Sequence, residues 1–510
     1  MELIKENLEF SEVRCKKSTV VYVDGDVIVP DVKPDILKIL QVDAVSRITD
    51  KEILDGEIRI KGTVKYNILY VPESEEDCIK SITSEMDFSH TIDKIDTSGE
   101  IYPKIMSDVE RVEFNLLNSR KLNIKTAVGI ECVCWGKKEI LVSKSIDDER
   151  AEAIYDTLRV HKIDVFAERG IGLRDRLEIP AGVSGISEIL KMDVSISGRE
   201  IKAITGKAIL KGNVEVSVLY LDMEKNIQSV NSELPFTEIA EIFDLEEDAK
   251  SLVEYRVGEY DYQVSMDADG EARCVDFDIS IIAEITSDGI EECEIMSDCF
   301  CPGKPARLIL EEVASDRVVS TESSQHTVKD VVSPDKKSPG ITSVYNVIPR
   351  PIVTKTVVED GCVIIEGKTE FYVLYITDNN QLPVYCLKKD VPISIKIDKP
   401  YAKAGLGCDV KINPEHIAYN INMANEVEVR CILSVDMKLI EKAKIPVITE
   451  IVEEEEKCEC GIVIYFVRPG DTLWNIAKRY SVSIDDLKEL NEIADRNQIK
   501  AGDRLIIPVC

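Results

Sequence analysis

The sequence predicts a mainly β protein in which three tandem β-rich domains with antiparallel sheets precede a small α+β (βααβ) domain. Three observations support this fold class. A strand-like segment recurs three times along the chain, Val and Ile are abundant while aromatic residues make up only 6%, and a strand–helix–helix–strand pattern occupies the C-terminal end. A length of 510 residues fits three or four domains of ordinary size.

The repeated segment begins with glycine, continues with alternating apolar and polar residues, and ends in Leu-Tyr. Its three copies are Gly62–Tyr70, Gly212–Tyr220 and Gly367–Tyr375. A matching upstream segment precedes each copy at the same distance, beginning at Asp35, Gly185 and Gly340. Downstream, each copy is followed by a similarly placed apolar residue, at Phe88, Phe236 and Ile393. This common spacing indicates an internal repeat of one structural unit.

Within the first copy, apolar residues occupy every second position, at Val64, Tyr66, Ile68 and Tyr70. This alternation predicts a strand with one buried and one solvated face. Leu69 and its equivalents Leu219 and Leu374 interrupt the alternation, so we expect this end of each strand to be covered on both sides. We expect short helices near residues 36–40 and at the equivalent positions.

The repeats divide the chain into domains at 1–150, 151–310 and 311–446, followed by an acidic linker at 447–461 and a terminal domain at 462–510. The linker contains four successive glutamates, Glu453 to Glu456. Like charges repel one another and favour an extended, solvated segment. We therefore expect the terminal domain to move freely relative to the body.

The terminal domain carries the segments Tyr465–Ala477 (YFVRPGDTLWNIA) and Ile499–Pro508 (IKAGDRLIIP), with Asn491 between them. This pattern closely resembles the LysM domain, a βααβ family that binds peptidoglycan and chitin glycans. We expect strands at 462–467 and 504–508. The first helix should begin near Leu473 and the second after Ser483, because Asp, Thr and Ser side chains accept hydrogen bonds from free helix N–H groups.

The resemblance implies a shallow glycan groove between two loops. The matching residues are Gly470, Asp471, Thr472 and Leu473 on one wall, and Asn497, Gln498 and Ile499 on the other. Asp471 as a helix cap and Leu473 as a core residue are equally simple interpretations. Trp474 is a candidate anchor for a protein partner if it is exposed, and otherwise packs on its own helix.

Three features favour a protein ligand over a glycan. The domain occurs once, whereas weak glycan sites gain affinity from several copies. The N-terminal residues contain no signal-peptide pattern and no run is long enough for a membrane span, so we expect a cytoplasmic protein. The domain itself is charge-balanced, although the chain carries a net charge of −32. That charge disfavours nucleic acid and anionic membranes as partners.

Tandem copies of this unit before one LysM domain resemble the clostridial spore-coat proteins with DUF3794 (SPOCS) repeats. The resemblance implies a non-enzymatic morphogenetic scaffold in the mother-cell cytoplasm, at the forespore surface and in the spore coat. Its implied partners are other coat proteins and the ATPase of the coat's basement layer, which the LysM domain would bind. The alternative is a peptidoglycan-binding protein at the forespore cortex or envelope, with weak glycan binding.

No catalytic constellation is visible, and we expect no enzyme, cofactor or metal. The four histidines, His90, His161, His326 and His416, match no metal or nucleophile motif. Three Cys-x-Cys pairs remain open between buried apolar packing and bridging or soft-metal binding. They are Cys132/Cys134, Cys299/Cys301 and Cys458/Cys460. The last pair is a redox candidate, since it falls in the linker.

Overall fold

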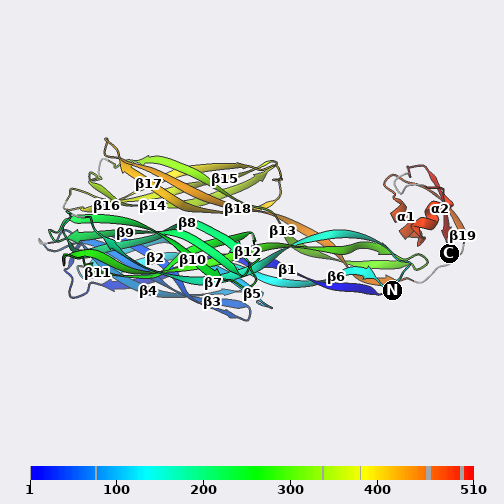
Figure 1. Ribbon diagram of the computed structural model, residues 1–510, viewed down its shortest axis with the longest axis horizontal. Helices are drawn as coiled ribbons and strands as arrows, with labels where there is room; N and C mark the ends of the chain where they lie inside the picture. The colour runs from blue at the N-terminus through cyan, green and yellow to red at the C-terminus, as the bar shows by residue number, and fades with distance from the viewer. Residues whose placement is uncertain are drawn as a thin grey trace.

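The computed structural model describes residues 2–74, 77–180, 182–247, 249–335, 338–379, 381–454, 461–493 and 499–509. In this part of the chain nearly all regular structure is antiparallel strand, and both helices lie near the C-terminal end. The mainly β fold class is therefore confirmed. Figure 1 shows an elongated molecule with a wide body, a narrow stalk and a small terminal domain at the tip of the stalk.

The first unit consists of two three-stranded sheets that enclose an apolar core. The sheet orders are β2-β3-β4 and β1-β6-β5. The strands are β1 (Leu3–Ile28), β2 (Ile36–Leu54), β3 (Glu57–Pro72), β4 (Lys80–Asp93), β5 (Ile101–Asn118) and β6 (Lys121–Ile146).

The second and third units repeat this topology strand for strand. In the second unit the sheet orders are β10-β9-β8 and β11-β12-β7, and in the third they are β14-β15-β16 and β13-β18-β17. The second unit contains β7 (Glu152–Glu178), β8 (Ile186–Ile204), β9 (Lys207–Asp222), β10 (Ile227–Glu241), β11 (Ser251–Met266) and β12 (Ala272–Phe300). The third contains β13 (Ala306–Val332), β14 (Ser343–Glu359), β15 (Cys362–Ile376), β16 (Val384–Asp398), β17 (Gly407–Ile421) and β18 (Val427–Glu453).

The expected helices near residues 36–40 and their equivalents are wrong. Residues 36–40 form the start of β2, where Ile36 lies opposite Pro72 and Ile39 opposite Tyr70 on β3. β8 and β14 occupy the equivalent places in the other units. Pairing with a neighbouring strand, together with register shifts after Ile36 and Ile39, decides the conformation here, and a short apolar run alone does not separate strand from helix.

The repeated glycine is explained by the strand beside it. Gly62 lies directly opposite Phe88 on β4, and a Cβ atom at this glycine would come within 2.4 Å of the Phe88 ring. Gly212 lies opposite Phe236 in the same way, and a Cβ there would come within 2.7 Å of that ring. In these two units the large side chain packs over the glycine, whereas in the third unit a Cβ at Gly367 would come within 2.2 Å of the Ile352 carbonyl oxygen on β14.

The three units meet at the end of their central strands. Leu69, Leu219 and Leu374 are all buried and belong to one apolar cluster, together with Leu190 and Tyr345. This confirms the prediction that the leucine in each repeat is covered on both sides. One side of each strand packs on the core of its own unit, and the leucine packs on the neighbouring units.

A buried ion-pair network lies beside this cluster and joins all three units. The ammonium of Lys191 lies 2.9 Å from a carboxylate oxygen of Asp43 and 2.7 Å from one of Asp193. The hydroxyl of Tyr345 donates a hydrogen bond of 3.0 Å to Asp193. Burial disfavours the charged lysine, but Asp193 and Asp43 outweigh burial and raise the pKa of Lys191. The lysine is therefore a cation shared by the three units.

A second charged group connects the outer sheets of the units. Lys104 on β5 lies 2.9 Å from Glu254 on β11 and 3.0 Å from Glu284 on β12. Glu254 also forms an ion pair with Lys411 on β17. Burial alone would raise the pKa of Glu254, but Lys411 and Lys104 outweigh it and lower the pKa to about 2.

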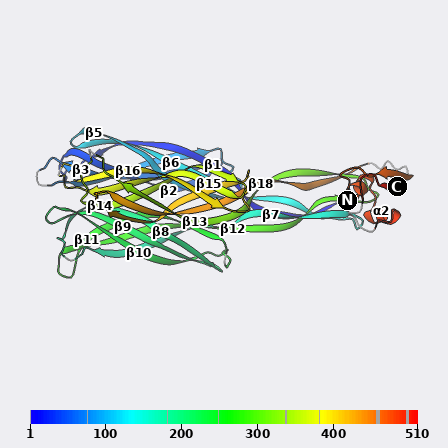
Figure 2. The ribbon, with the colours of Figure 1, turned by 90° about the horizontal axis from the view of Figure 1, so that it is seen from above.

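The stalk consists of three two-stranded ribbons, one from each unit. The pairs β1/β6, β7/β12 and β13/β18 continue beyond the body and run together, as Figures 1 and 2 show. The ribbons enclose a small apolar core of their own. Its buried residues are Leu8, Phe10, Val142, Leu158, Val160, Cys293, Ile295 and Val447.

The last strand of the stalk extends into the predicted linker, so the linker begins later than expected. Residues 447–453 form the end of β18, and Val447 and Ile448 are buried among the ribbons, so this part of the predicted 447–461 linker is strand. Apolar residues between the glutamates let the segment pair with β13 in spite of its charge. β13 likewise begins at Ala306, before the expected boundary at residue 311. Residues 455–460 of the linker lie outside the described residues.

We predict that Lys191→Ala lowers the free energy of unfolding by about 3 kcal/mol, because it leaves the half-buried carboxylates of Asp43 and Asp193 without their shared cation. Urea denaturation followed by circular dichroism measures this loss. Lys396→Ala is the matched control, since the Lys396 side chain is 62% exposed and pairs only across the surface with Asp398. Equal denaturation midpoints for the two variants would contradict the assigned role of Lys191.

We predict that Glu254 contributes stability near neutral pH that is lost in acid. Its folded pKa of about 2 lies below the ordinary value of 4.5, so the contribution is complete above pH 4.5 and declines as the pH falls toward 2. Its size is up to about 3 kcal/mol. Denaturation midpoints between pH 7 and 3 should fall less in Glu254→Gln than in the wild type. Glu200→Gln, at a carboxylate that is 71% exposed, should retain the wild-type slope.

Candidate functional site at the tip of the stalk

The terminal domain has the predicted order of strand, helix, helix and strand. β19 (Gly461–Phe466) pairs antiparallel with β20 (Arg504–Val509), and α1 (Leu473–Tyr480) and α2 (Ile484–Leu490) lie between them in sequence. Helices and strands share one core. Its buried residues are Tyr465, Val467, Leu473, Ile476, Ala477, Val482, Ile484, Leu487, Leu505 and Ile507. Leu490, at the end of α2, is 47% exposed.

Hydrogen bonds from side chains to the backbone fix both helix starts. The Thr472 hydroxyl accepts a bond of 3.1 Å from the Asn475 N–H, and Ser483 caps α2 in the same way. Asp471 does not cap the helix. Its carboxylate accepts hydrogen bonds from the Tyr465 hydroxyl at 2.6 Å and from the Arg468 N–H at 2.8 Å. The bond from Tyr465 lowers the pKa of Asp471.

Asn491 joins the second helix to the second strand. Its side-chain amide donates to the carbonyl oxygens of Leu487 and Ile506 at 2.8 and 2.7 Å. Its side-chain oxygen accepts a bond of 2.6 Å from the Ile506 N–H. These bonds satisfy backbone groups at the end of α2 and on β20, so this motif residue has a structural role.

The candidate groove residues have different environments. Gly470 and Thr472 are exposed at the turn before α1, whereas Leu473 is buried in the core. Ile499 is half-buried against the same core. Asn497 and Gln498 lie outside the described residues. On the first wall, therefore, only the turn offers atoms to a ligand, while Asp471 and Leu473 hold the domain together.

Trp474 packs on the stalk of its own chain. Its indole N–H donates a hydrogen bond of 2.7 Å to Asp298 at the end of β12. Its ring meets Phe300 edge to face, with ring centroids 5.0 Å apart. The ring is half-buried and also packs against the core that α1 shares with the rest of its domain. No local pattern in the sequence indicates the contact with the stalk, because Asp298 and Phe300 lie far from Trp474 in the chain.

Further contacts hold the LysM domain against the stalk tip. Lys478 on α1 forms an ion pair with Asp298. The Ile484 N–H at the start of α2 donates to Glu152 at 2.8 Å, and the Gly303 N–H donates to the Ser481 carbonyl at 2.8 Å. The expected free movement of the terminal domain is therefore not what the structure shows. Figure 1 shows the domain at the end of the stalk.

The outer face of the small sheet is apolar and exposed. Ile462, Ile464 and Phe466 alternate with inward-facing residues on β19, and their side chains are 72%, 57% and 62% exposed. Ile506 and Pro508 lie beside them on β20 and are half-buried. A row of large apolar side chains on one face of so small a domain is typical of an interaction surface.

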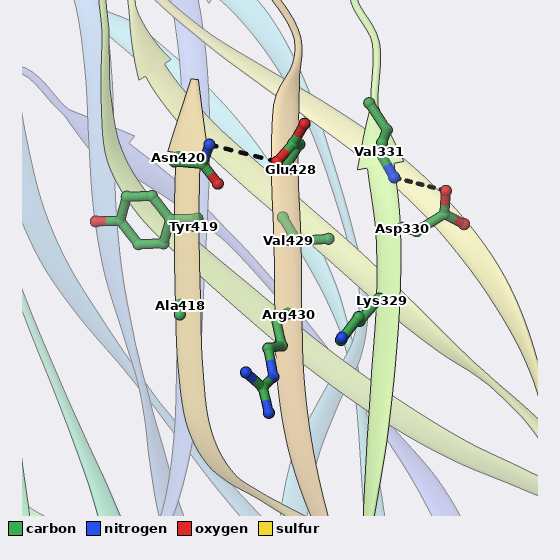
Figure 3. Close-up of a pocket in the computed structure, with 9 residues that line it drawn as sticks. All are labelled: Lys329, Asp330, Val331, Ala418, Tyr419, Asn420, Glu428, Val429 and Arg430. Carbon is green, nitrogen blue, oxygen red and sulfur yellow. Dashed lines mark hydrogen bonds between the residues drawn. The ribbon is translucent and has the colours of Figure 1, made fainter. Parts of the chain in front are cut away.

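A shallow hollow of about 540 Å³ lies on a sheet of the third unit (Figure 3). Lys329 and Arg430 lie opposite each other on neighbouring strands, and Asn420 donates to Glu428 at 3.4 Å. The lining residues are Lys329, Asp330, Val331, Ala418, Tyr419, Asn420, Glu428, Val429 and Arg430. The lining contains charges of both signs and one tyrosine, but no serine, cysteine or histidine.

The three Cys-x-Cys pairs lie in different parts of the chain's structure. Cys132 and Cys134 are buried in the first unit, where β1 brings Cys15 beside them. Cys299 and Cys301 are buried near the stalk tip. Cys458 and Cys460 lie outside the described residues. The four histidines are distributed over β4, β7, β13 and β17, so the fold does not gather them into one site.

We predict that Asp298→Ala combined with Phe300→Ala releases the LysM domain from the stalk. The two changes remove a charge-assisted hydrogen bond and an aromatic contact, so the released population should rise at least about tenfold. In a Trp135→Phe background, Trp474 is the only tryptophan and its emission should shift to longer wavelength. Asp485→Ala, at a carboxylate that is 86% exposed on α2, is the control. Unchanged emission in the double variant would contradict the docking contact.

Comparison with family models identifies the domain described as SipL, SPOCS domain at residues 35–117, 185–265 and 340–422. A LysM domain matches residues 465–508. No curated protein and no solved structure matches the chain. Within the described residues, no helix is both long and apolar enough to cross a bilayer.

The matches confirm the resemblance to spore-coat proteins with tandem SPOCS repeats. SPOCS and LysM domains are non-catalytic binding or scaffold domains, and the SipL family implies association with the spore coat. LysM domains indicate glycan binding as a class. The chain is therefore a sporulation-related protein that carries three tandem SipL SPOCS domains followed by one LysM binding domain.

Proposed function

We propose that this protein is a non-enzymatic scaffold of spore-coat morphogenesis whose LysM domain binds the ATPase of the coat's basement layer. It would act in the mother-cell cytoplasm at the forespore surface and promote encasement of the forespore. The observation that carries the proposal is the exposed apolar face of Ile462, Ile464 and Phe466 at the tip of a stalk. The matched SPOCS domains give this face its spore-coat setting.

The surfaces of the LysM domain differ in whether they remain exposed while the domain lies on the stalk. Trp474 and Lys478 on α1 are committed to Asp298 of the stalk. The outer sheet face carries large apolar side chains with high exposure. Large aliphatic and aromatic side chains at the centre of a contact patch favour a protein partner, because binding of the partner removes their apolar surface from water. This is why we propose the sheet face, in place of Trp474, as the surface for the ATPase.

The rest of the molecule supports a scaffold role. The three SPOCS units form one body through the Lys191 network, and the stalk holds the LysM domain away from that body. From residue 3 to residue 13, β1 alone extends the stalk by roughly 35 Å at the usual rise of a strand. We propose that the units themselves bind other coat proteins, at 1–150, 151–310 and 311–446, while the tip engages the basement layer.

The alternative is a peptidoglycan-binding protein at the forespore cortex or envelope. It is favoured by the LysM family itself and by the exposed turn at Gly470 and Thr472. Under this alternative the turn and the opposite loop of Asn497, Gln498 and Ile499 would contact the sugar. A single copy predicts weak glycan binding.

We predict that the pair Ile464→Glu and Phe466→Glu reduces recovery of the basement-layer ATPase at least about tenfold in co-purification. Glutamate side chains at the centre of an apolar contact reduce the apolar surface that is buried there. Binding must also remove their charges from water, which costs free energy. The matched control is Ile239→Glu with Phe243→Glu on the second unit, where the side chains are 59% and 90% exposed. A chain that ends at Gly461 should lose the ATPase as well.

Two outcomes decide between the proposals. Equal recovery of the ATPase by the wild type and by the chain ending at Gly461 would overturn docking through the LysM domain. Sedimentation with purified peptidoglycan tests the alternative. The scaffold proposal requires little pulldown of the wild type, whereas strong pulldown that is retained in the Ile464→Glu and Phe466→Glu variant would favour the glycan proposal.

A further inference from the structure

Three buried cysteines converge inside the first SPOCS unit. The Sγ atoms of Cys15, Cys132 and Cys134 all lie within 4.8 Å of one another, and those of Cys132 and Cys134 are 3.5 Å apart. The three residues are 6%, 0% and 0% exposed. They lie on β1 and β6, at the end of the core that is nearest the stalk.

Strand pairing between β1 and β6 brings the third thiol to the other two. Cys132 and Cys134 are two residues apart on one strand, so their side chains share a face. Cys15 lies directly opposite Cys134 and points to the same buried face. In β1 the register shifts just beyond Cys15, toward Val13, and the other two units have the same shift before Val165 and Ser320. The shift therefore belongs to the repeat, whereas the three thiols belong to the first unit.

Packing alone does not require three thiols here, because the second unit offers an internal comparison. There the register shift between Ile163 and Val165 corresponds to the one before Cys15, and the next pairs are Val165 opposite Ser287 and Ala167 opposite Ile285. In the first unit the same pair of steps places Cys15 opposite Cys134 and Lys17 opposite Cys132. Val165, Ile285 and Ser287 therefore stand in place of the three cysteines. A core of this shape therefore closes without sulfur.

The geometry of the thiols matches a three-coordinate metal site. Metal–thiolate bonds of about 2.3 Å in a trigonal plane place the sulfurs about 4 Å apart, which lies within the spacing of the three Sγ atoms. Among the described residues no histidine or carboxylate completes the group to four ligands. Zinc sites in proteins are almost always tetrahedral, whereas soft thiolate ligands also select monovalent copper.

We propose that Cys15, Cys132 and Cys134 form a binding site for one soft, thiophilic metal ion of the copper(I) class, held by three sulfur ligands. Binding releases one proton for each thiol that becomes a thiolate. The monovalent ion and Lys17, which lies opposite Cys132 on β1, offset the negative charge of the thiolates. The proposal concerns the SPOCS body and does not depend on what the LysM domain binds.

The experiment titrates the reduced, full-length protein with copper(I) under anaerobic conditions, against a coloured chelator that competes for the ion. Because the site is buried, copper is supplied both to the folded protein and during refolding. We expect one tightly held ion per chain. X-ray absorption of the loaded wild type should show three sulfur ligands at about 2.3 Å.

The matched variant carries the residues of the second unit, Cys15→Val, Cys132→Ile and Cys134→Ser, and should lose the tight site with at least a hundredfold weaker binding. The control removes two buried cysteines outside the cluster, by Cys274→Ala and Cys431→Ala, and should retain it. Circular dichroism and thermal melting of both variants report folding. Retention of the tight site in the triple variant would overturn the proposal. A linear two-sulfur site or nitrogen and oxygen ligands in the wild-type absorption spectrum would overturn it even if the triple variant does not fold.

Discussion

The buried cation of Lys191 is the interaction on which the arrangement of the molecule depends. A lysine removed from water is stable only when carboxylates surround it, and here these come from two units, at Asp43 and Asp193, while Tyr345 of the third unit bonds to Asp193. The three units must therefore pack together for the charge to be satisfied. Apolar contacts around Leu219 bury area at this junction, and the ion pairs and the Tyr345 hydrogen bond add directional contacts between the units.

The stalk and the position of the LysM domain follow from the relative orientation of the units. Each ribbon of the stalk is the continuation of two strands of one unit, so a rotation of one unit would remove its ribbon from the shared core around Phe10 and Val160. The stalk tip then presents Asp298 and Phe300 to Trp474. The Lys191 ion pairs between the units thus determine where the LysM domain lies at the far end of the stalk.

The strands of this fold can be predicted from local sequence patterns, but the contacts between distant strands and domains cannot. Strand pairing and burial leave patterns that repeat over a few residues, so one segment is enough to see them. Examples are the alternation around Tyr66, the recurring glycine and the interruption of the alternation at Leu69. The start of β2 at Ile36 depends on a partner strand, and a short apolar run does not encode that partner. The contact between Trp474 and Asp298 depends on residues 176 positions apart. The Cys15 thiol lies beside Cys134 because β1 pairs with β6, and 119 positions separate the two residues in the sequence.

The docking of Trp474 changes which part of the LysM domain is available to a ligand. A glycan groove would use the exposed turn at Gly470 and Thr472, which is held rigid from behind by the bonds of Asp471. The sheet face of Ile464 and Phe466 points away from the domain core, and its side chains remain exposed while α1 lies on the stalk. Because the domain is held by α1, a partner on the sheet face meets a surface fixed relative to the whole body. The scaffold can then transmit the orientation of its three units to whatever it binds at the tip, which a freely moving terminal domain would not do.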